Sequence, residues 1–341
     1  MAVDAPLVIW GAGAIGGTIG AYLSRAGHDV LFVDSAAEHV ARINQRGLTI
    51  SGPIDRFTIA AKAVTPGELD GVYERIILAV KTPATVVAAN ALSRHLAADG
   101  FVVSAQNGLN EYVIADIVGP ERVMGCFVNF GADYHAPGEI LYGGRGAMVL
   151  GEMDGGATDR LTRLHGLLRA FEPDALITEN IFGYLWSKMA YGAMLFAEAL
   201  TEASIADCLA HPDYRELFIA LAREVLAVAR AHGVTPEAFN GFDPAAFMPG
   251  GNDGAARASM DKMVAFNRKS AKTHSGIWRD IAVRKRKTEV DALPGAVPAL
   301  AAEKDLRAPL CETLTALIHE VEDGKRPQSW ETLDVLKAVL P

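Results

Sequence analysis

A glycine-rich motif near the start of the chain constrains the fold more than any other feature. Gly11, Gly13 and Gly16 are spaced as Gly-x-Gly-x-x-Gly, and they follow a short apolar run at residues 7–10. The motif opens a helical pattern that covers residues 14–25. A strand, this motif and a helix, in that order, predict a βαβ unit that binds a dinucleotide.

Each glycine of the motif has its own physical role. Gly11 permits the tight turn, Gly13 lets the backbone approach a pyrophosphate, and Gly16 allows close packing of helix and strand. The helix start supplies N–H groups and a positive dipole end. The alternative, a glycine-rich turn without a ligand, is less consistent with this context. The residues expected at the cofactor are Gly11, Ala12, Gly13, Ala14, Ile15 and Gly16.

An acidic residue, Asp34, ends the second predicted strand. Its distance from the glycine motif is close to the ~20 residues at which dinucleotide-binding units carry a carboxylate for the ribose 2′-hydroxyl. A carboxylate there accepts a hydrogen bond from the hydroxyl and repels a 2′-phosphate, so Asp34 favours NAD over NADP. The alternative is an aspartate that only caps the next helix.

Short apolar runs alternate with helical patterns in the first half of the chain. Strands are predicted at residues 7–10, 29–33, 75–80 and 101–104, and helices at residues 14–25, 38–45 and 85–96. Runs that are apolar on both faces predict an α/β fold, with a mostly parallel sheet covered by helices on each side.

The pattern changes after about residue 180. Helices are predicted at residues 180–200, 214–232, 262–286 and 308–323, and a Pro- and Gly-rich loop at residues 242–254. We therefore predict an α/β domain over residues 1–175 and an all-helical domain over residues 176–341.

Composition excludes several classes of protein. The 341 residues are 50% hydrophobic and 21% charged, which is too close to globular averages for a disordered chain. The net charge of −9 argues against non-specific binding to nucleic acid or anionic membranes. No apolar run approaches the ~20 residues of a membrane span. The N-terminus has no positively charged segment, so no signal peptide is expected.

The three cysteines, Cys126, Cys208 and Cys311, are odd in number and far apart in sequence. They show no disulfide framework and no metal-ligand spacing, so we expect no metal site. A reducing, cytoplasmic location is the expectation from this cysteine usage.

Five short polar motifs remain outside the glycine loop. Val-Lys-Thr at residues 80–82 and Gln-Asn-Gly-Leu at residues 106–109 follow the third and fourth predicted strands, where ligands of parallel sheets bind. Later in the chain come Trp-Ser-Lys at residues 186–188, a segment from Ser to Asp-Ile at residues 275–281, and Thr-Glu-Val-Asp at residues 288–291.

In this order and spacing, these motifs resemble the ketopantoate reductase (2-dehydropantoate 2-reductase) family over most of the chain. The resemblance implies a Rossmann-type domain followed by a helical domain that binds substrate and carries the catalytic lysine. It also implies reduction of the 2-keto group of ketopantoate, a small anionic keto acid, as a step of pantothenate biosynthesis. The nicotinamide cofactor of the family is usually NADPH, whereas Asp34 favours NAD, so both cofactors stay open.

The resemblance implies a role for five polar residues. Lys188 matches the catalytic lysine, and Glu289 matches the carboxylate that contacts the substrate hydroxyl. Asn107 matches the asparagine near the nicotinamide and the lysine, and Lys81 a lysine close to the cofactor. Ser275 matches the serine that binds the substrate carboxylate.

The chemistry of hydride addition supports a lysine independently. Hydride addition to a ketone builds negative charge on oxygen, which an ammonium group stabilises and protonates. Lys188 is the single lysine of an apolar stretch at residues 182–197 of the predicted helix. Structural alternatives stay open for each residue: a snorkelling Lys188, a helix-start carboxylate at Glu289, an Asn-Gly turn at Asn107, an N-cap at Ser275 and a solvated Lys81.

Spacing constrains the segment that carries Ser275 and Glu289. In one straight helix the two residues would lie about 21 Å apart, too far to touch one small keto acid. We therefore expect a break near residues 285–288, with Glu289 in the first turn of the next helical piece. Thr288 and Asp291 form a Thr-x-x-Asp pattern that suits such a start.

The sequence departs from the family after the lysine. The family has asparagines four and eight residues further on, and this chain has Gly192 and Phe196. A glycine there makes room for a ligand or for close packing, so Gly192 joins Lys188, Ser275 and Glu289 as an expected substrate-binding residue. The basic run at residues 284–287 is either a solvated helix end or a contact for an anionic substrate.

These departures leave three functional hypotheses. The first is NAD(P)H-dependent reduction of a 2-keto acid, with ketopantoate as the leading candidate. The second is a related dehydrogenase for a different 2-keto, 3-hydroxy or opine-type acid with NAD. The third is a non-catalytic dinucleotide sensor, which would need neither Lys188 nor Glu289. The apolar helices also leave a homodimer possible.

Overall fold

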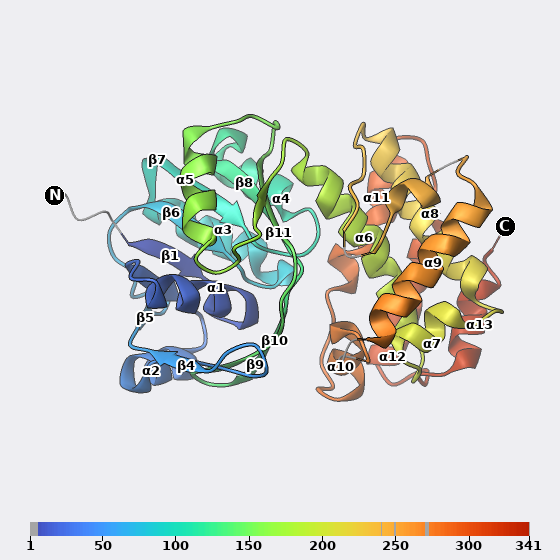
Figure 1. Ribbon diagram of the computed structural model, residues 1–341, viewed down its shortest axis with the longest axis horizontal. Helices are drawn as coiled ribbons and strands as arrows, with labels where there is room; N and C mark the ends of the chain where they lie inside the picture. The colour runs from blue at the N-terminus through green and yellow to red at the C-terminus, as the bar shows by residue number, and fades with distance from the viewer. Residues whose placement is uncertain (1–5, 240, 249, 270–272, 341) are drawn as a thin grey trace. The chain divides into compact units, whose positions relative to one another are not determined.

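The computed structural model describes residues 6–239, 241–248, 250–269 and 273–340. The chain forms two compact units, which divide between Ile181 and Phe182. Figure 1 shows a unit of strands and helices in the first part of the chain and a unit of helices in the second. The fold is thus an α/β unit with a mostly parallel sheet, followed by an all-helical unit, as the sequence predicts.

The first unit is built on an eight-stranded sheet. Its strand order is β12-β11-β8-β7-β6-β1-β2-β5, and every neighbouring pair is parallel except β8 and β11. The strands are β1 Leu7–Trp10, β2 Val30–Val33, β5 Lys62–Val64, β6 Tyr73–Leu78, β7 Leu96–Ser104, β8 Val123–Val128, β11 Met148–Glu152 and β12 Leu176–Ile177.

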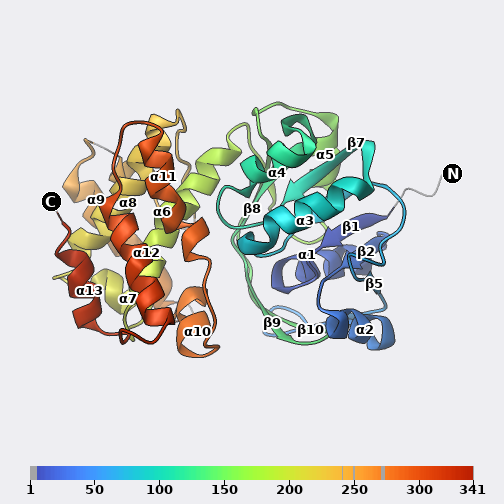
Figure 2. The ribbon, with the colours of Figure 1, turned by 180° about the vertical axis from the view of Figure 1, so that it is seen from behind.

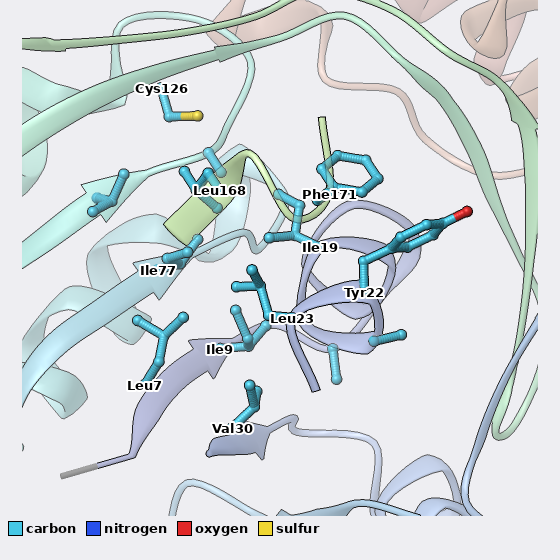
Figure 3. Close-up of a cluster of buried hydrophobic side chains, with 14 of the residues drawn as sticks. Leu7, Ile9, Ile19, Tyr22, Leu23, Val30, Ile77, Cys126, Leu168 and Phe171 are labelled. Atoms are coloured by element: carbon cyan, nitrogen blue, oxygen red, sulfur yellow. The ribbon is translucent and has the colours of Figure 1, made fainter. Parts of the chain in front are cut away.

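Helices cover both faces of this sheet. They are α1 Ala14–Arg25, α2 Ala37–Arg46, α3 Thr85–Leu92, α4 Asn110–Val118 and α5 Asp159–Leu168. Successive residues of a strand point to opposite faces, so Leu7 and Ile9 of β1 pack with α1 and α5, whereas Val8 and Trp10 pack with α3 and α4. Figure 3 shows the first cluster, and Figure 2 shows the side of α3 and α4. The apolar strands predicted from the sequence are therefore buried on both faces.

A second sheet was not predicted. It has the order β4-β3-β10-β9 and consists of β3 Leu48–Ser51, β4 Phe57–Ile59, β9 Gly131–Ala136 and β10 Glu139–Gly144. It packs on α1, where a Cβ at Gly17 would overlap the side chain of Ile140. Its strands are only three to six residues long, so the alternation in β3 and β4 is too brief to identify a strand. The predicted helix at residues 85–96 was also too long, because α3 ends at Leu92 and β7 begins at Leu96.

The second unit consists of helices over the residues that are described. They are α6 Ile181–Glu198, α7 Ile205–Ala210, α8 Arg215–Ala231, α9 Asp253–Arg268, α10 Gly276–Ala282, α11 Val297–Ala302, α12 Pro309–Glu322 and α13 Trp330–Lys337. In the described part of the chain, no helix combines the length and apolarity that a membrane crossing requires.

One helix of the second unit was predicted wrongly. The continuous helix expected over residues 262–286 is two helices, because α9 ends at Arg268 and α10 begins after Ser275. Ser275 caps α10, and Lys285 has φ of 51°, which the interior of a right-handed helix does not accept. The predicted loop at residues 242–254 contains a short 3-10 helix, η4 Pro244–Phe247, and Asp253 already belongs to α9. Residues 249 and 270–272 of these ranges lie outside the described residues.

Candidate active site

The glycine-rich loop has the geometry that its sequence predicts. Gly11 has φ of 99°, and a Cβ there would lie 2.8 Å from the backbone nitrogen of Val80. A Cβ at Gly16 would overlap the carbonyl oxygen of Gly11, so this glycine is required for close packing of α1. Among the described residues other than Gly13 and its two chain neighbours, no atom lies within 4 Å of a Cβ built on Gly13, the N-cap of α1. The loop thus leaves open space where a pyrophosphate would approach the helix start.

Asp34 lies beside this loop and is held by two backbone groups. Its Oδ2 accepts a hydrogen bond of 2.9 Å from the N–H of Ala12, and its Oδ1 accepts one of 2.9 Å from the N–H of Ala36. Each carboxylate oxygen still has a lone pair for a ribose hydroxyl. The bond from Ala36 forms a local turn before α2, whose N-cap, Ala36, has no side-chain cap hydrogen bond. The carboxylate of Asp34 lies next to the backbone of the glycine loop.

Two further loops meet at the same edge of the sheet. The backbone runs from β6 into Val80, Lys81 and Thr82, and from the neighbouring β7 into Gln106 and Asn107. The side-chain amide of Gln106 donates a hydrogen bond of 2.8 Å to the carbonyl of Val80, and the hydroxyl of Thr82 donates one of 3.2 Å to that of Asn107. The structure therefore brings the glycine loop and the two predicted strand-end motifs to adjacent strand ends.

Asn110 completes this link and was missed by the sequence reasoning. Its side-chain amide donates to the carbonyl of Asn107 at 2.6 Å and to the hydroxyl of Thr82 at 3.1 Å. Its side-chain oxygen accepts a hydrogen bond of 2.9 Å from Thr85. The sequence shows only an asparagine two residues after the Asn-Gly pair, and its burial at the start of α4 is visible only in the structure. Asn110 positions the backbone of Asn107 rather than pointing to solvent.

Lys188 lies on the partly exposed face of α6. Its neighbours Trp186 and Met189 are buried, whereas Lys188 and Gly192 are partly exposed and lie one turn apart. In the described structure, a Cβ at Gly192 would meet no atom within 4 Å beyond its own helix backbone and chain neighbours. Phe196, by contrast, is 1% exposed and packs inside the unit. The open space beside the lysine therefore comes from Gly192, and Phe196 is a core residue.

Ser275 and Glu289 lie on separate pieces of the second unit. Ser275 is 1% exposed, and its hydroxyl accepts a hydrogen bond of 3.0 Å from the N–H of Trp278, which is the N-cap geometry. The helix stops at Ala282, and Glu289 directly precedes a short 3-10 helix, η5 Val290–Ala292. The expected interruption is present and starts a few residues earlier than residue 285.

The basic run at residues 284–287 is tied to carboxylates of its own unit. Arg284 and Arg286 each place a nitrogen 2.8 Å from Oδ1 of Asp280, and Lys287 lies 2.5 Å from Oδ1 of Asp323. These ion pairs favour the structural interpretation of the run. They hold the non-helical segment that leads to Glu289.

Glu322 anchors the same segment from α12. Its Oε1 accepts hydrogen bonds of 2.7 Å from both the backbone N–H and the hydroxyl of Thr288. Its Oε2 lies 3.3 Å from Nδ1 of His319, whose Nε2 lies 2.8 Å from Oδ1 of Asp291. Carboxylates therefore hold His319 on both sides, next to the residues that flank Glu289.

This arrangement predicts a pH dependence of stability. Burial opposes protonation of His319, but hydrogen bonds and charges from Asp291 and Glu322 outweigh it and raise the pKa of His319 above its usual value. The folded state therefore binds this proton more tightly. The stabilisation is complete below the unfolded pKa of about 6.5 and is lost as the pH rises through the raised folded pKa. We expect His319→Gln to lower Tm more at about pH 5.5 than at about pH 8.5, and equal losses at both would contradict the ion pairs.

Both halves of the chain match models of known families. Residues 7–155 match the model described as ketopantoate reductase PanE/ApbA, and residues 180–322 match ketopantoate reductase PanE/ApbA C terminal. The protein class is therefore an NAD(P)-dependent oxidoreductase that acts on a CH–OH group. Within this class, the chain belongs to the ketopantoate reductase family.

Relatives and solved structures agree with this family over nearly the whole chain. A 2-dehydropantoate 2-reductase of Pyrococcus abyssi is 28% identical over 326 residues, which cover 94% of this chain and 99% of the relative. The 2-dehydropantoate 2-reductase of Geobacter metallireducens GS-15 has a TM-score of 0.78 at 26% identity, covering 92% of this chain and 99% of that one. D-mandelate dehydrogenase with NADH and anilino(oxo)acetate has a TM-score of 0.80 at 20% identity, covering 94% and 99%, and shows the shared fold.

Proposed function

We propose that this protein reduces a 2-keto acid with NADH or NADPH, with ketopantoate to pantoate as the leading reaction and Lys188 as the general acid. The observation that carries the proposal is the position of Lys188. It is the only cation of α6, a mostly apolar helix, and it is partly exposed, with open space at Gly192 one turn away. The two-unit fold and the family support the class of reaction.

The glycine loop, Asp34 and the strand-end loops fit a nicotinamide dinucleotide. Gly13 leaves the room that a pyrophosphate needs, and the start of α1 offers backbone N–H groups to it. When bound, the reduced cofactor supplies the hydride that adds to carbon 2 of the keto acid. Lys81 and Asn107 are the residues proposed to contact it from the ends of β6 and β7.

The remaining chemistry belongs to side chains of this chain. The ammonium of Lys188 stabilises negative charge on the ketone oxygen and donates its proton there, which leaves a 2-hydroxy acid and a neutral lysine. Glu289 accepts a hydrogen bond from the substrate hydroxyl. Ser275, whose hydroxyl accepts from Trp278, still has its own proton to donate to the substrate carboxylate.

We propose NADH as the preferred cofactor because of Asp34. Replacing Asp34 by Ala removes the charge that repels a 2′-phosphate and the acceptor for a ribose hydroxyl. We expect the ratio of kcat/KM for NADH to kcat/KM for NADPH to fall by about tenfold or more, since like charges at a contact cost several kcal/mol. Steady-state kinetics with both cofactors measure this ratio, and an unchanged ratio would contradict the assignment.

A second candidate is the NADH-dependent reduction of a keto acid with a bulkier, apolar substituent. Gly192 stands where the family has an asparagine that binds the polar end of the substrate, and it leaves space instead. The fold shared with D-mandelate dehydrogenase, whose structure holds NADH and anilino(oxo)acetate, is consistent with such a substrate. The 3-hydroxy and opine-type acids stay further alternatives.

A substrate comparison tests the two candidates. Purified protein is given ketopantoate or phenylglyoxylate, each with NADH and NADPH, and nicotinamide absorbance is followed. A higher kcat/KM for ketopantoate supports the leading reaction, and a higher value for phenylglyoxylate supports the second. Cofactor binding without turnover of any 2-keto, 3-hydroxy or opine-type acid would favour a sensor and reject both. A cytoplasmic location and a homodimer stay predictions.

A further inference from the structure

A histidine outside every motif is built into the dinucleotide loop. His39 lies on α2 and is 1% exposed. Its Nε2 lies 2.9 Å from the carbonyl oxygen of Ala12, and its Nδ1 lies 2.9 Å from the backbone nitrogen of Gly138. A backbone N–H only donates, so Nδ1 accepts and Nε2 carries the proton that is donated to Ala12. The hydrogen bonds thus fix one neutral tautomer of His39.

These bonds join two parts of the chain that are distant in sequence. Ala12 is the residue between the first two glycines of the loop, and Gly138 lies in the turn between β9 and β10. The N–H of Ala12 donates to Asp34 while its carbonyl accepts from His39, so polar groups on both sides of this residue are held. A loop with three glycines loses much backbone entropy when it is ordered. His39 and Asp34 order it before a ligand arrives, which favours binding.

The hairpin of β9 and β10 also brings an aromatic ring to this place. Tyr134 of β9 packs edge-on against His39, with ring centroids 5.1 Å apart and an interplanar angle of 66°. Tyr134 is 39% exposed. Burial and the nearby charges of Asp34 and Glu38 raise the pKa of the Tyr134 phenol. The charge of Asp34, the carboxylate expected to bind the ribose, therefore acts on this phenol.

We propose that His39 is a positioning residue of the dinucleotide site, and that Tyr134, aligned by His39, contacts the adenosine half of the dinucleotide. The proposal rests on the dinucleotide binding that the proposed function requires. A partly exposed aromatic ring that packs on a residue bound to the glycine loop offers a stacking surface for the base of an adenosine. The β9–β10 hairpin is thereby part of the cofactor site, although it belongs to the second sheet.

Direct binding measurements separate this inference from the catalytic function. Calorimetry with NADH, ADP-ribose and nicotinamide mononucleotide needs no keto acid. In His39→Phe, which keeps a ring but neither hydrogen bond, we expect the Kd of NADH and of ADP-ribose to rise by about tenfold. In His39→Gln, which keeps a donor and an acceptor, most of the affinity should return. Tyr134→Ala should weaken ADP-ribose and leave nicotinamide mononucleotide unchanged.

A matched control is available in the same unit. Nε2 of His165, on α5, lies 2.7 Å from the carbonyl oxygen of Ala175, so His165→Phe loses one histidine-to-carbonyl hydrogen bond outside the glycine loop. Its Kd for NADH should equal that of the wild type. If His165→Phe weakened NADH binding as much as His39→Phe does, general destabilisation would explain both losses and the inference would be overturned.

The remaining outcomes are distinct. If wild-type protein binds none of NADH, NADPH and ADP-ribose, the proposed function fails. If the wild type binds NADH and ADP-ribose and the His39 and Tyr134 variants bind them equally well, only this inference is overturned. Should His39→Phe fail to fold, His39→Gln and Tyr134→Ala decide: Tyr134→Ala with wild-type affinity for ADP-ribose overturns the adenosine contact.

Discussion

Lys188→Met is expected to lower kcat for keto-acid reduction by about 100- to 10,000-fold, the range typical for loss of a general acid. The variant should leave the Kd of NADH unchanged. Methionine keeps an unbranched side chain on the partly exposed face of α6, so the helix should stay intact while the proton donor and the positive charge are lost. Stopped-flow turnover and NADH titration measure the two quantities separately.

A control lysine distinguishes charge at the site from charge in general. Lys304, an exposed residue of the second unit, can be changed to Met with the same loss of net charge. We expect Lys304→Met to have the kcat of the wild-type protein. If Lys188→Met retained wild-type kcat, the assignment of the general acid would be wrong. Loss of NADH binding together with kcat would point instead to a damaged fold.

The second large effect concerns two glycines of the same loop. Gly16→Ala should lower the free energy of unfolding by about 1–3 kcal/mol or more, because its methyl group would overlap the carbonyl oxygen of Gly11. Gly13→Ala should leave that free energy nearly unchanged, because its methyl group enters open space and its backbone φ of −71° suits alanine. Chemical denaturation of the protein without cofactor measures both.

For cofactor binding, Gly13→Ala is the variant expected to have a large effect. A methyl group at Gly13 occupies the space through which a pyrophosphate approaches the start of α1, so the Kd of NADH should rise by about tenfold or more. Stable Gly13→Ala protein with wild-type affinity would contradict the placement of the pyrophosphate. Wild-type stability of Gly16→Ala would contradict the close packing of α1.

Local sequence signals predicted the parts of the fold that depend on local interactions. The helix that follows the glycine motif has the predicted bounds, because a tight turn after β1 and Gly27 after its end define it. The prediction of one long helix over residues 262–286 was wrong, because a new helix begins at Gly276 with Ser275 as its N-cap. An N-cap at Ser275 was considered as an alternative role for this residue, but it was not used to divide the predicted helix.

The features that the sequence did not reveal depend on contacts between residues that are distant in the chain. The N–H of Gly138 donates a hydrogen bond to His39, which lies 99 residues earlier in the chain. Sequence periodicity cannot predict such a pair. The β9–β10 hairpin has largely partly exposed residues, so its pattern resembled a loop. Asn110 belongs to the same category, because its role depends on the loops that it joins. Gln106 lies in a predicted motif, but its hydrogen bond to Val80 is visible only in the structure. For the expected site residues, the structure gives local geometry, and their catalytic roles stay proposals.

Transfer of deuterium tests the central claim most directly. Wild-type protein is incubated with ketopantoate, or another 2-keto acid, and NADH that carries deuterium at the transferable position of the nicotinamide. Mass spectrometry then locates the label. We predict one deuterium at carbon 2 of the resulting 2-hydroxy acid, with its formation strongly reduced in Lys188→Met. Tight binding of NADH with no labelled product from any 2-keto acid would contradict the account.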